Sequence, residues 1–184
     1  MFGKDQLRKK YFSIRKKKYF KINPNFFNPF IKLLKKKNKK KIFNLSCYYP
    51  TAYEVDVFQI FESNFINRLN ILLPVVARNN SMFFYKWKKN EILKINQYGI
   101  LEPATLSKPI VPDAMLVPIL AYDKDNNRLG YGKGYYDRYL YKYIKKYKNI
   151  FTIGVAFSFQ KYHKLPTSIN DVRLDYILTE KGIY

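Results

Sequence analysis

Hydrophobic residues recur every three or four positions near the start of the chain, which is the spacing of an amphipathic helix. One such stripe predicts a helix over residues 4–21, with Leu7, Tyr11, Ile14 and either Lys18 or Tyr19 on its inner side. Asn23-Pro24 should break this helix, and a second helix is expected near residues 25–37. Both predicted helices carry basic residues on their outer sides.

The next segments alternate between strand and helix patterns. An apolar run at residues 41–48 predicts a buried strand. Hydrophobic residues at helical spacing then predict an amphipathic helix from Glu54 to Arg68, with Val57, Phe58, Phe61, Phe65 and Leu69 on one side. Residues 70–76 and 82–87 are short apolar segments around the polar cluster 78–81, so we expect two paired strands joined by a turn.

The second half of the chain contains a strand, a glycine-rich loop, a helix and a further strand. Residues 114–121 are apolar on both faces, as in a central strand covered by helices, but Pro118 cannot donate a ladder hydrogen bond, so the strand should end near it. Residues 151–157 form another apolar strand. The inner side of the helix between them is predicted to carry Tyr136, Leu140, Tyr143, Ile144 and Tyr147. This βαβ order predicts the α/β fold class: a single-domain layered sandwich with a mainly parallel sheet flanked by helices.

The strong positive charge is concentrated at the N-terminus. The 184 residues, enough for one ordinary domain (1–184), carry a formal charge of +22. Residues 1–41 hold sixteen Lys or Arg and one acid, which gives +15, and the remainder holds nineteen against twelve, which gives +7. Lys outnumbers Arg by 28 to 7, a bias that an AT-rich coding sequence would produce. We therefore interpret residues 1–40 as a basic helical segment of the same domain, its charge either functional or compositional.

The single cysteine, Cys47, lies in an apolar run and cannot form an internal disulfide, so a reducing cytoplasm is the expected compartment. No apolar run approaches the roughly 20 residues of a membrane span. Basic residues alternate with aromatic ones over residues 4–21, so a membrane-surface helix or an organelle presequence is an alternative interpretation of that segment.

The segment from Arg128 to Arg138 is the strongest functional signal. It reads R-L-G-Y-G-K-G-Y-Y-D-R, and glycines let backbone N–H groups approach an anion closely. The spacing differs from G-x-x-x-x-G-K-[ST] and from G-x-G-x-x-G, so neither a P-loop nor a Rossmann nucleotide site is predicted. A tight turn before a helix, with Asp137 complementing the helix dipole, is the simplest alternative. The flanking cations Arg128, Lys133 and Arg138 favour a phosphate site.

This segment resembles the signature of the 5-formyltetrahydrofolate cyclo-ligase family. Four further blocks are similar to that family and follow in the same order: Lys4-Asp5-Gln6-Leu7-Arg8; Tyr49-Pro50 with Glu54-Val55-Asp56; Tyr98-Gly99-Ile100-Leu101-Glu102-Pro103; and Gly154-Val155-Ala156-Phe157, Leu165-Pro166, Asp171, Leu174-Asp175 and Thr179-Glu180. Two positions depart from the pattern. Val57 stands where the family usually has Thr, and Tyr98 stands where other aromatic residues occur.

The resemblance implies a ligase of folate one-carbon metabolism. Such an enzyme consumes ATP and 5-formyltetrahydrofolate, with Mg²⁺, and releases 5,10-methenyltetrahydrofolate, ADP and phosphate. The substrate would carry its glutamate tail with or without further glutamates, which a basic rim would attract. We expect a monomer that has no membrane partner and no specific nucleic-acid partner.

The resemblance also implies roles for individual residues. The residues expected to bind ATP are Lys4, Arg8, Arg128, Leu129, Gly130, Tyr131, Gly132, Lys133, Gly134, Tyr135 and Tyr136. Those expected to bind folate are Tyr49, Glu54, Tyr98, Tyr131 and Tyr135. Lys133, Arg128 and Tyr136 are the expected catalytic residues, and Asp137 and Asp171 the expected magnesium ligands. Asp171 is also interpretable as a turn residue, Glu54 as a helix-opening acid, and His163 receives no role.

Two other functions remain open from the sequence. The basic segment 1–41, with its interleaved aromatic residues, is also typical of an RNA-associated protein. A related ATP-dependent enzyme, or an inactive relative that keeps the fold, would differ at the folate site, so Tyr49, Glu54 and Tyr98 discriminate that alternative.

Overall fold

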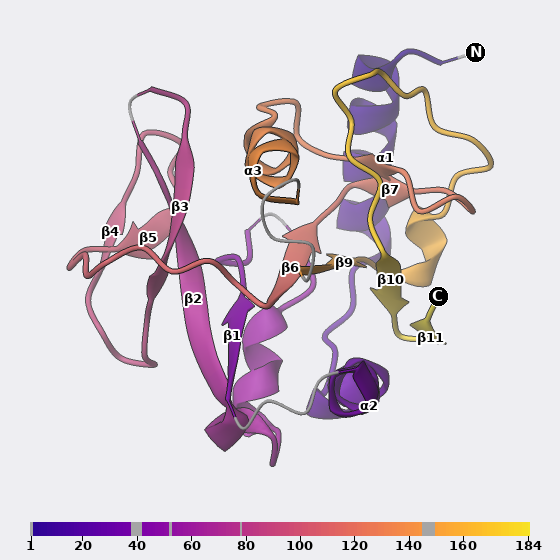
Figure 1. Cartoon of the computed structure of the whole chain (residues 1–184). Helices are drawn as coiled ribbons and strands as arrows, with labels where there is room; N and C mark the ends of the chain where they lie inside the picture. Colours follow the sequence, from indigo (N-terminus) through magenta and orange to yellow (C-terminus); the bar gives the residue numbers. More distant parts are fainter. Residues whose placement is uncertain (1, 38–41, 52, 78, 145–149) are drawn as a thin grey trace.

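The centre of the protein is a mostly parallel sheet. The computed structural model describes residues 2–37, 42–51, 53–77, 79–144 and 150–184. Within these residues one sheet has the strand order β11-β10-β9-β6-β1-β2-β3. The inner strands pair in parallel, and the edge strands β3 and β11 are antiparallel to their neighbours (Figure 1). The elements in chain order are α1 (Lys4–Lys18), η1 (Pro24–Phe27), α2 (Asn28–Lys37), β1 (Phe43–Ser46), η2 (Val57–Glu62), η3 (Ile66–Arg68), β2 (Leu69–Val76), β3 (Met82–Lys86), β4 (Leu93–Ile95), β5 (Leu101–Pro103), β6 (Ala114–Pro118), β7 (Ala121–Tyr122), β8 (Arg128–Leu129), α3 (Tyr135–Ile144), β9 (Phe151–Val155), η4 (Ser158–Gln160), β10 (Tyr176–Thr179) and β11 (Gly182–Ile183).

Helices cover both faces of this sheet. Successive strand residues point to opposite faces, so Leu45 and Ile71 belong to a core cluster on one side, and Leu72 and Met115 to a second cluster on the other. The first cluster includes residues of α2, and the second includes residues of α3. Figure 1 shows α2 below the sheet and α3 above it. The predicted α/β layered fold class is confirmed.

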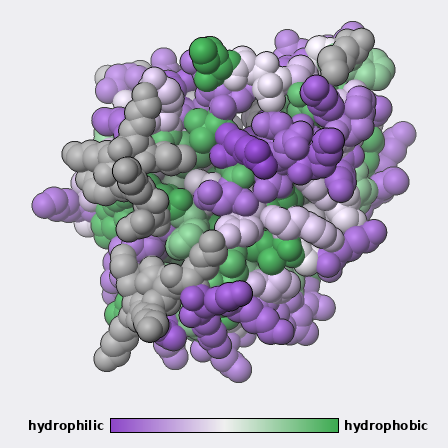
Figure 2. All heavy atoms as spheres, turned by 45° about the vertical axis from the view of Figure 1, so that its right-hand side comes forward, coloured by the Kyte–Doolittle hydropathy of each residue, from purple (hydrophilic) through white to green (hydrophobic). Residues whose placement is uncertain are grey.

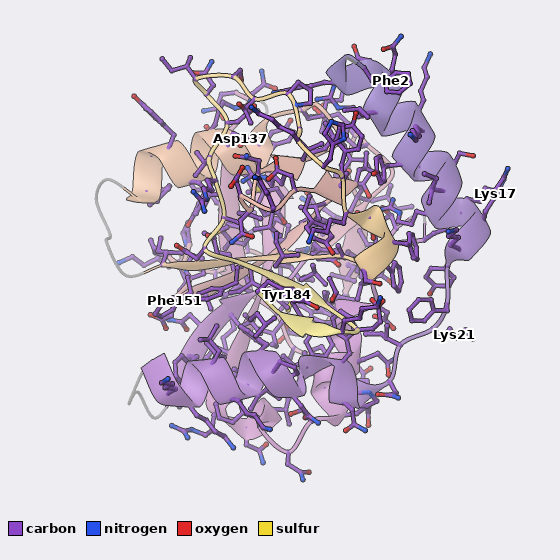
Figure 3. All side chains as sticks on the ribbon, turned by 90° about the vertical axis from the view of Figure 1, so that its right-hand side faces the viewer. Phe2, Lys17, Lys21, Asp137, Phe151 and Tyr184 are labelled. Carbon is purple, nitrogen blue, oxygen red and sulfur yellow. The ribbon has the colours of Figure 1, made fainter. Side chains whose placement is uncertain are left out.

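The N-terminal helix packs on a small hairpin at one end of the sheet. Leu7 and Tyr11 of α1 form a third buried cluster with Leu120 and Leu129, which flank or belong to the β7–β8 pair. The outer side of α1 is exposed, and Figure 3 shows Lys17 pointing away from the protein body. On the face that Figure 2 shows, hydrophilic residues predominate, with hydrophobic ones visible between them.

The predicted βαβ unit is confirmed. β6 and β9 pair in parallel from Ala114↔Phe151 to Pro118↔Val155, with α3 between them in the chain. β6 ends at Pro118, because proline has no backbone N–H to donate to a neighbouring strand. The chain then leaves the main sheet and forms β7. The predicted pairing of the strands on either side of residues 78–81 is also confirmed, because β2 and β3 are antiparallel neighbours, although Arg78 of the turn lies outside the described residues.

The predicted amphipathic helix over residues 54–68 is wrong. The segment forms two short 3-10 helices, η2 and η3, with a break after Glu62. Val57 and Ile60 are buried three residues apart, a spacing that suits three residues per turn, and the Asp56 side chain accepts a hydrogen bond from the N–H of Phe58 at 3.0 Å. Val57 and the three phenylalanines of the hydrophobic pattern also have lower helix propensity than Ala or Leu.

Other predicted boundaries shift slightly. The first helix ends at Lys18, the second begins as the 3-10 turn η1 before α2, and β9 ends at Val155. On α3 the buried residues are Tyr139 and Leu140, whereas Tyr147 and the side chain of Ile144 lie outside the described part of the chain. Cys47 is buried directly after β1, as expected, and burial raises the pKa of its thiol. Among the described residues, the search for a helix long and apolar enough to cross a membrane finds none.

Candidate active site

A cleft of about 510 Å³ opens where β1, β2 and β6 end. The carboxyl ends of parallel strands are the usual place for ligand sites in open α/β sheets, and this volume lies in the usual range for small-molecule sites. Every site residue predicted from the sequence lies on the wall of this cleft: Lys4, Arg8, Tyr49, Glu54, Tyr98, Arg128, Leu129, Gly130, Tyr131, Gly132, Lys133, Gly134, Tyr135, Tyr136, Asp137 and Asp171. Five segments far apart in the sequence therefore meet at one site.

The glycine loop needs its glycines for two different reasons. Gly132 has φ of 92° and Gly134 has φ of 67°, a region that other residues rarely adopt. A Cβ on Gly132 would also lie 3.2 Å from the Cζ atom of Arg8. Arg8 itself donates from Nε to the carbonyl of Gly130 at 2.9 Å, so α1 contacts the loop directly.

Two cation–carboxylate pairs stand at one end of the cleft. The guanidinium of Arg128 bonds to Oδ1 of Asp137 and, at 2.6 Å, to the carbonyl of Val172. Lys4 pairs with Asp171 at 2.5 Å. Burial raises the pKa of Asp171, but the bonds from Lys4 and from the N–H of Ser168 outweigh it and leave that pKa below its ordinary value. Asp137 stands in the first turn of α3, where Figure 3 labels it, and 29 % of its side chain is exposed.

A partly buried chain of hydrogen bonds runs from α1 through Tyr131 of the loop to Glu54. Nη2 of Arg15 donates to the hydroxyl of Tyr131 at 2.6 Å, and that hydroxyl donates to Oε1 of Glu54 at 2.5 Å. Oε2 of Glu54 accepts from the backbone N–H of Thr51 at 2.8 Å. Burial raises the pKa of Glu54, while the bonds from Tyr131 and Thr51 and the charge of Arg15 oppose that rise.

The outer side of the loop is more exposed. The hydroxyls of Tyr98 and Tyr135 are 2.7 Å apart, and Nζ of Lys133 lies 5.4 Å from the centroid of the Tyr98 ring. The Oδ1 atom of Asn96 accepts from the N–H groups of Tyr98 and Ile100, which fixes the turn that carries Tyr98. These aromatic rings and the lysine form a surface on which a flat ligand can stack beside the glycine loop.

Sequence reasoning missed the remaining wall of the cleft and one buried cation. The missed lining residues are mostly apolar: Tyr48, Thr51, Pro74, Val76, Met82, Asn96, Ile100 and Pro118. Tyr48, Val76 and Pro118 stand at the ends of predicted strands, and that position is the signal that could have found them. Arg15, only 1 % exposed, was missed because a helical stripe was read from apolar residues alone.

Four further residues have structural settings outside the proposed chemistry. Val57, which stands where the family usually has Thr, is buried in the core, and Asp56 supplies the cap of η2. Arg138 donates to the carbonyl of Asn80 at 3.2 Å, and its guanidinium lies 4.9 Å from the centroid of the Tyr135 ring. His163 is exposed, beside the ring of Tyr162, and is not part of the cleft wall.

Fold and site together define an α/β protein with a cleft that joins a glycine loop and cationic side chains to aromatic walls. Comparison with known proteins then specifies the family. The sequence model of the 5-formyltetrahydrofolate cyclo-ligase family matches residues 5–180, so the chain belongs to that family and is a ligase of folate one-carbon metabolism.

Individual relatives agree with this assignment. The chain is 31 % identical over 141 residues to the 5-formyltetrahydrofolate cyclo-ligase of Haemophilus influenzae, covering 73 % of this chain and 74 % of that protein. It is similar to the solved structure of a 5,10-methenyltetrahydrofolate synthetase from Mycoplasma pneumoniae, with 28 % identity, a TM-score of 0.71, and coverage of 97 % and 99 % of the two chains. The NMR structure of the Aquifex aeolicus 5,10-methenyltetrahydrofolate synthetase matches with 30 % identity, a TM-score of 0.72, and coverage of 98 % and 91 %.

Proposed function

We propose that this protein uses ATP and Mg²⁺ to convert 5-formyltetrahydrofolate to 5,10-methenyltetrahydrofolate, with release of ADP and phosphate. The observation that carries this proposal is the single cleft that joins Glu54, Tyr49 and Tyr98 to the glycine loop. A nucleotide on the loop and a flat folate against the aromatic residues would then share one site, as transfer between them requires.

ATP is proposed to bind on the glycine-loop side of the cleft. Lys4, Arg8 and Lys133 lie on its wall together with the glycine backbone. Phosphoryl transfer depends on positioning and on neutralised charge, which these cations and N–H groups supply. Arg128 is buried and already bonded to Asp137, so its proposed contribution is to hold the loop and that carboxylate in place while adding positive charge from behind.

The donor set fits a magnesium ion at the same end. Asp137 and Asp171 both line the cleft and offer carboxylate oxygens, the ligands that Mg²⁺ prefers. Arg128 and the N–H of Val172 both bond to Oδ1 of Asp137, while Oδ2 accepts no hydrogen bond from any residue that the structure describes. When bound, Mg²⁺ would neutralise phosphate charge. The ion pair with Lys4 keeps Asp171 ionised for such a role.

The folate ring is proposed to lie between Glu54 and the aromatic side chains. Tyr49, Tyr98 and Tyr135 provide flat apolar surface, and the Glu54 carboxylate can accept N–H bonds from the substrate. The formyl oxygen would then face the glycine loop. This placement accounts for the mixture of aromatic and acidic residues in one wall of the cleft.

The proposed reaction has two steps. The formyl oxygen attacks the γ-phosphorus of ATP, the bond to the bridging oxygen breaks, and ADP leaves. N10 then attacks the formyl carbon and loses its proton, and the C–O bond breaks to release inorganic phosphate. Lys133 would stabilise charge on the transferred phosphoryl group, and Tyr136, whose buried hydroxyl has no hydrogen-bond partner in the described part of the chain, would donate to an oxygen of the substrate.

The direct test is the growth of methenyltetrahydrofolate absorbance by purified protein. Product should form only when ATP, Mg²⁺ and 5-formyltetrahydrofolate are all present, and Asp137→Asn should abolish it. Growth without ATP, or full activity of Asp137→Asn, would overturn the mechanism. The matched control is Asp125→Asn, an acid in the turn between β7 and β8 that is not part of the cleft wall.

We propose that the protein acts as a monomer in the cytoplasm and accepts folates with or without a polyglutamate tail. The alternative of an RNA-associated protein predicts steeply salt-dependent RNA binding that survives Asp137→Asn. Lys4 and Arg8 of the basic segment line the cleft, which favours the enzymatic use of at least this part of it.

A further inference from the structure

The partly buried hydrogen-bond chain from α1 to Glu54 has a fixed direction. A guanidinium can only donate hydrogen bonds, so the Tyr131 oxygen must accept from Arg15 at 2.6 Å. The single proton of that hydroxyl is then left to be donated to Glu54 at 2.5 Å. Glu54 therefore receives a hydrogen bond at Oε1, and Thr51 supplies further donors at Oε2. An arrangement of donors alone favours a carboxylate over a carboxylic acid.

We propose that Arg15 is a positioning residue: through Tyr131 it holds the Glu54 carboxylate ionised and correctly aimed for folate binding. The inference rests on the proposed folate role of Glu54. It assigns a function to a side chain that lies outside the cleft wall and acts only through another residue.

The surroundings of Arg15 support a specific role over general packing. Its side chain belongs to a helix whose last turn is otherwise exposed and basic, yet Arg15 is 1 % exposed. Its guanidinium lies 5.5 Å from the centroid of the Tyr131 ring and also reaches the carbonyl of Ile119 at 3.4 Å. Burying an arginine is costly unless it is paired, and the Tyr131–Glu54 chain provides the compensating negative charge.

Arg15 is also the charged group that can control Glu54. The other groups facing Glu54 are Thr51, Tyr48 after β1, Tyr131 in the glycine loop and Tyr136 on α3. Burial raises the pKa of Tyr48, Tyr131 and Tyr136, so these phenols stay neutral over the pH range of an assay. Among these neighbours Arg15 carries the positive charge, which opposes protonation of Glu54 together with the hydrogen bonds from Tyr131 and Thr51.

The test replaces Arg15 by Met and by Lys. Arg15→Met should raise KM for 5-formyltetrahydrofolate about tenfold while leaving KM for ATP and the fold little changed, because a hydrogen bond to a charged group is lost. Arg15→Met should also shift the titration of the Glu54 carboxyl to higher pH. This shift is measured by NMR on ¹³C-labelled protein without substrate. Arg15→Lys, which also only donates, should restore most of both properties. Lys17→Leu, an exposed change on the same helix, is the matched control.

A second variant keeps the test decisive if Arg15→Met does not fold. Tyr131→Phe removes only the linking hydroxyl and should reproduce both effects. In Arg15→Met/Tyr131→Phe the KM rise should stay near tenfold rather than reach about a hundredfold, because both changes break one chain.

Three outcomes separate the possibilities. An unchanged Glu54 titration in Arg15→Met or Tyr131→Phe overturns this inference, and the proposed function stands if Glu54→Gln still raises KM for folate. If KM rises equally for ATP and for folate, Arg15 has a merely structural role, and this inference is overturned. No effect of Glu54→Gln on folate binding overturns the folate assignment itself, and this inference with it.

Discussion

The two sides of the glycine loop are built differently. On the buried side, Arg128 is held by Asp137 and the carbonyl of Val172, and its side chain is 5 % exposed. On the open side, Arg138 and Lys133 contact the rings of Tyr135 and Tyr98 and remain exposed. Similar basic residues only a few positions apart therefore have different tasks. The buried side fixes the shape of the loop, and the open side is free to meet a ligand.

The largest expected effect comes from breaking the buried side. Arg128→Leu would leave Asp137 unpaired and the Val172 carbonyl without its donor, so we expect a loss of about 3 kcal/mol in the free energy of unfolding, measured with denaturant. Activity should fall by about a hundredfold or more, a combined loss of loop geometry and of charge. Arg138→Leu is the matched change on the open side and should cost about 0.5 kcal/mol or less. Equal costs would remove the distinction between the two sides.

A smaller effect is expected at the loop glycines. Gly132→Ala combines a positive φ with a Cβ 3.2 Å from the Arg8 guanidinium, so it should lower activity about tenfold through roughly 1–2 kcal/mol of strain. At Gly130 nothing lies within 4 Å of an added Cβ and φ is not positive, so Gly130→Ala should cost less. Steady-state rates of the two variants give the comparison. A greater loss in Gly130→Ala would contradict the loop geometry.

The pH dependence of folate binding tests the buried acid. Burial raises the pKa of Glu54 above the ordinary value of about 4.3, so the carboxylate gains a proton at a higher pH than an exposed glutamate would. KM for 5-formyltetrahydrofolate should therefore rise as the pH falls toward that raised value. Glu54→Gln should remove this rise of KM at low pH and give a higher KM for 5-formyltetrahydrofolate at every pH. If KM still rises at low pH in Glu54→Gln, a group other than Glu54 causes that rise.

The smallest expected effect is on the open side. Tyr135→Phe removes one of two hydroxyls that lie 2.7 Å apart in an exposed position, where water can replace the lost partner. We expect KM for folate to rise about two- to fivefold, equivalent to roughly 0.5–1 kcal/mol. Tyr98→Phe should behave alike, and the double variant should cost little more than either single change. Stability by thermal unfolding should hardly move in any of the three.

Much of the molecule follows from local patterns in the sequence. The β6–α3–β9 unit and the end of β6 at Pro118 could be predicted because a proline, a glycine loop and an apolar run each constrain the backbone locally. The site residues could be named because the glycine loop and the other blocks resemble one family. These features need no knowledge of what packs against them.

The rest depends on contacts that no local pattern contains. The 54–68 segment shows helical spacing, but tertiary packing and a cap from Asp56 give two 3-10 helices. In the sequence, Arg15 is one of several basic residues in a row, a pattern typical of an exposed surface. Its hydrogen bond to Tyr131, 116 positions later, distinguishes it from its neighbours, and the sequence does not show that contact. The ion pairs of Arg128 and Lys4 could not be predicted for the same reason, because the sequence does not show which carboxylates these two cations meet.

The central claim is that the cleft binds ATP and 5-formyltetrahydrofolate together and transfers phosphate between them. A single measurement tests it most directly: transfer of ³²P from γ-labelled ATP by purified protein, with and without 5-formyltetrahydrofolate. Labelled inorganic phosphate should appear together with methenyltetrahydrofolate in equal amounts, and only when both substrates and Mg²⁺ are present. Phosphate release that is independent of the folate, or methenyltetrahydrofolate formed without phosphate release, would contradict the account.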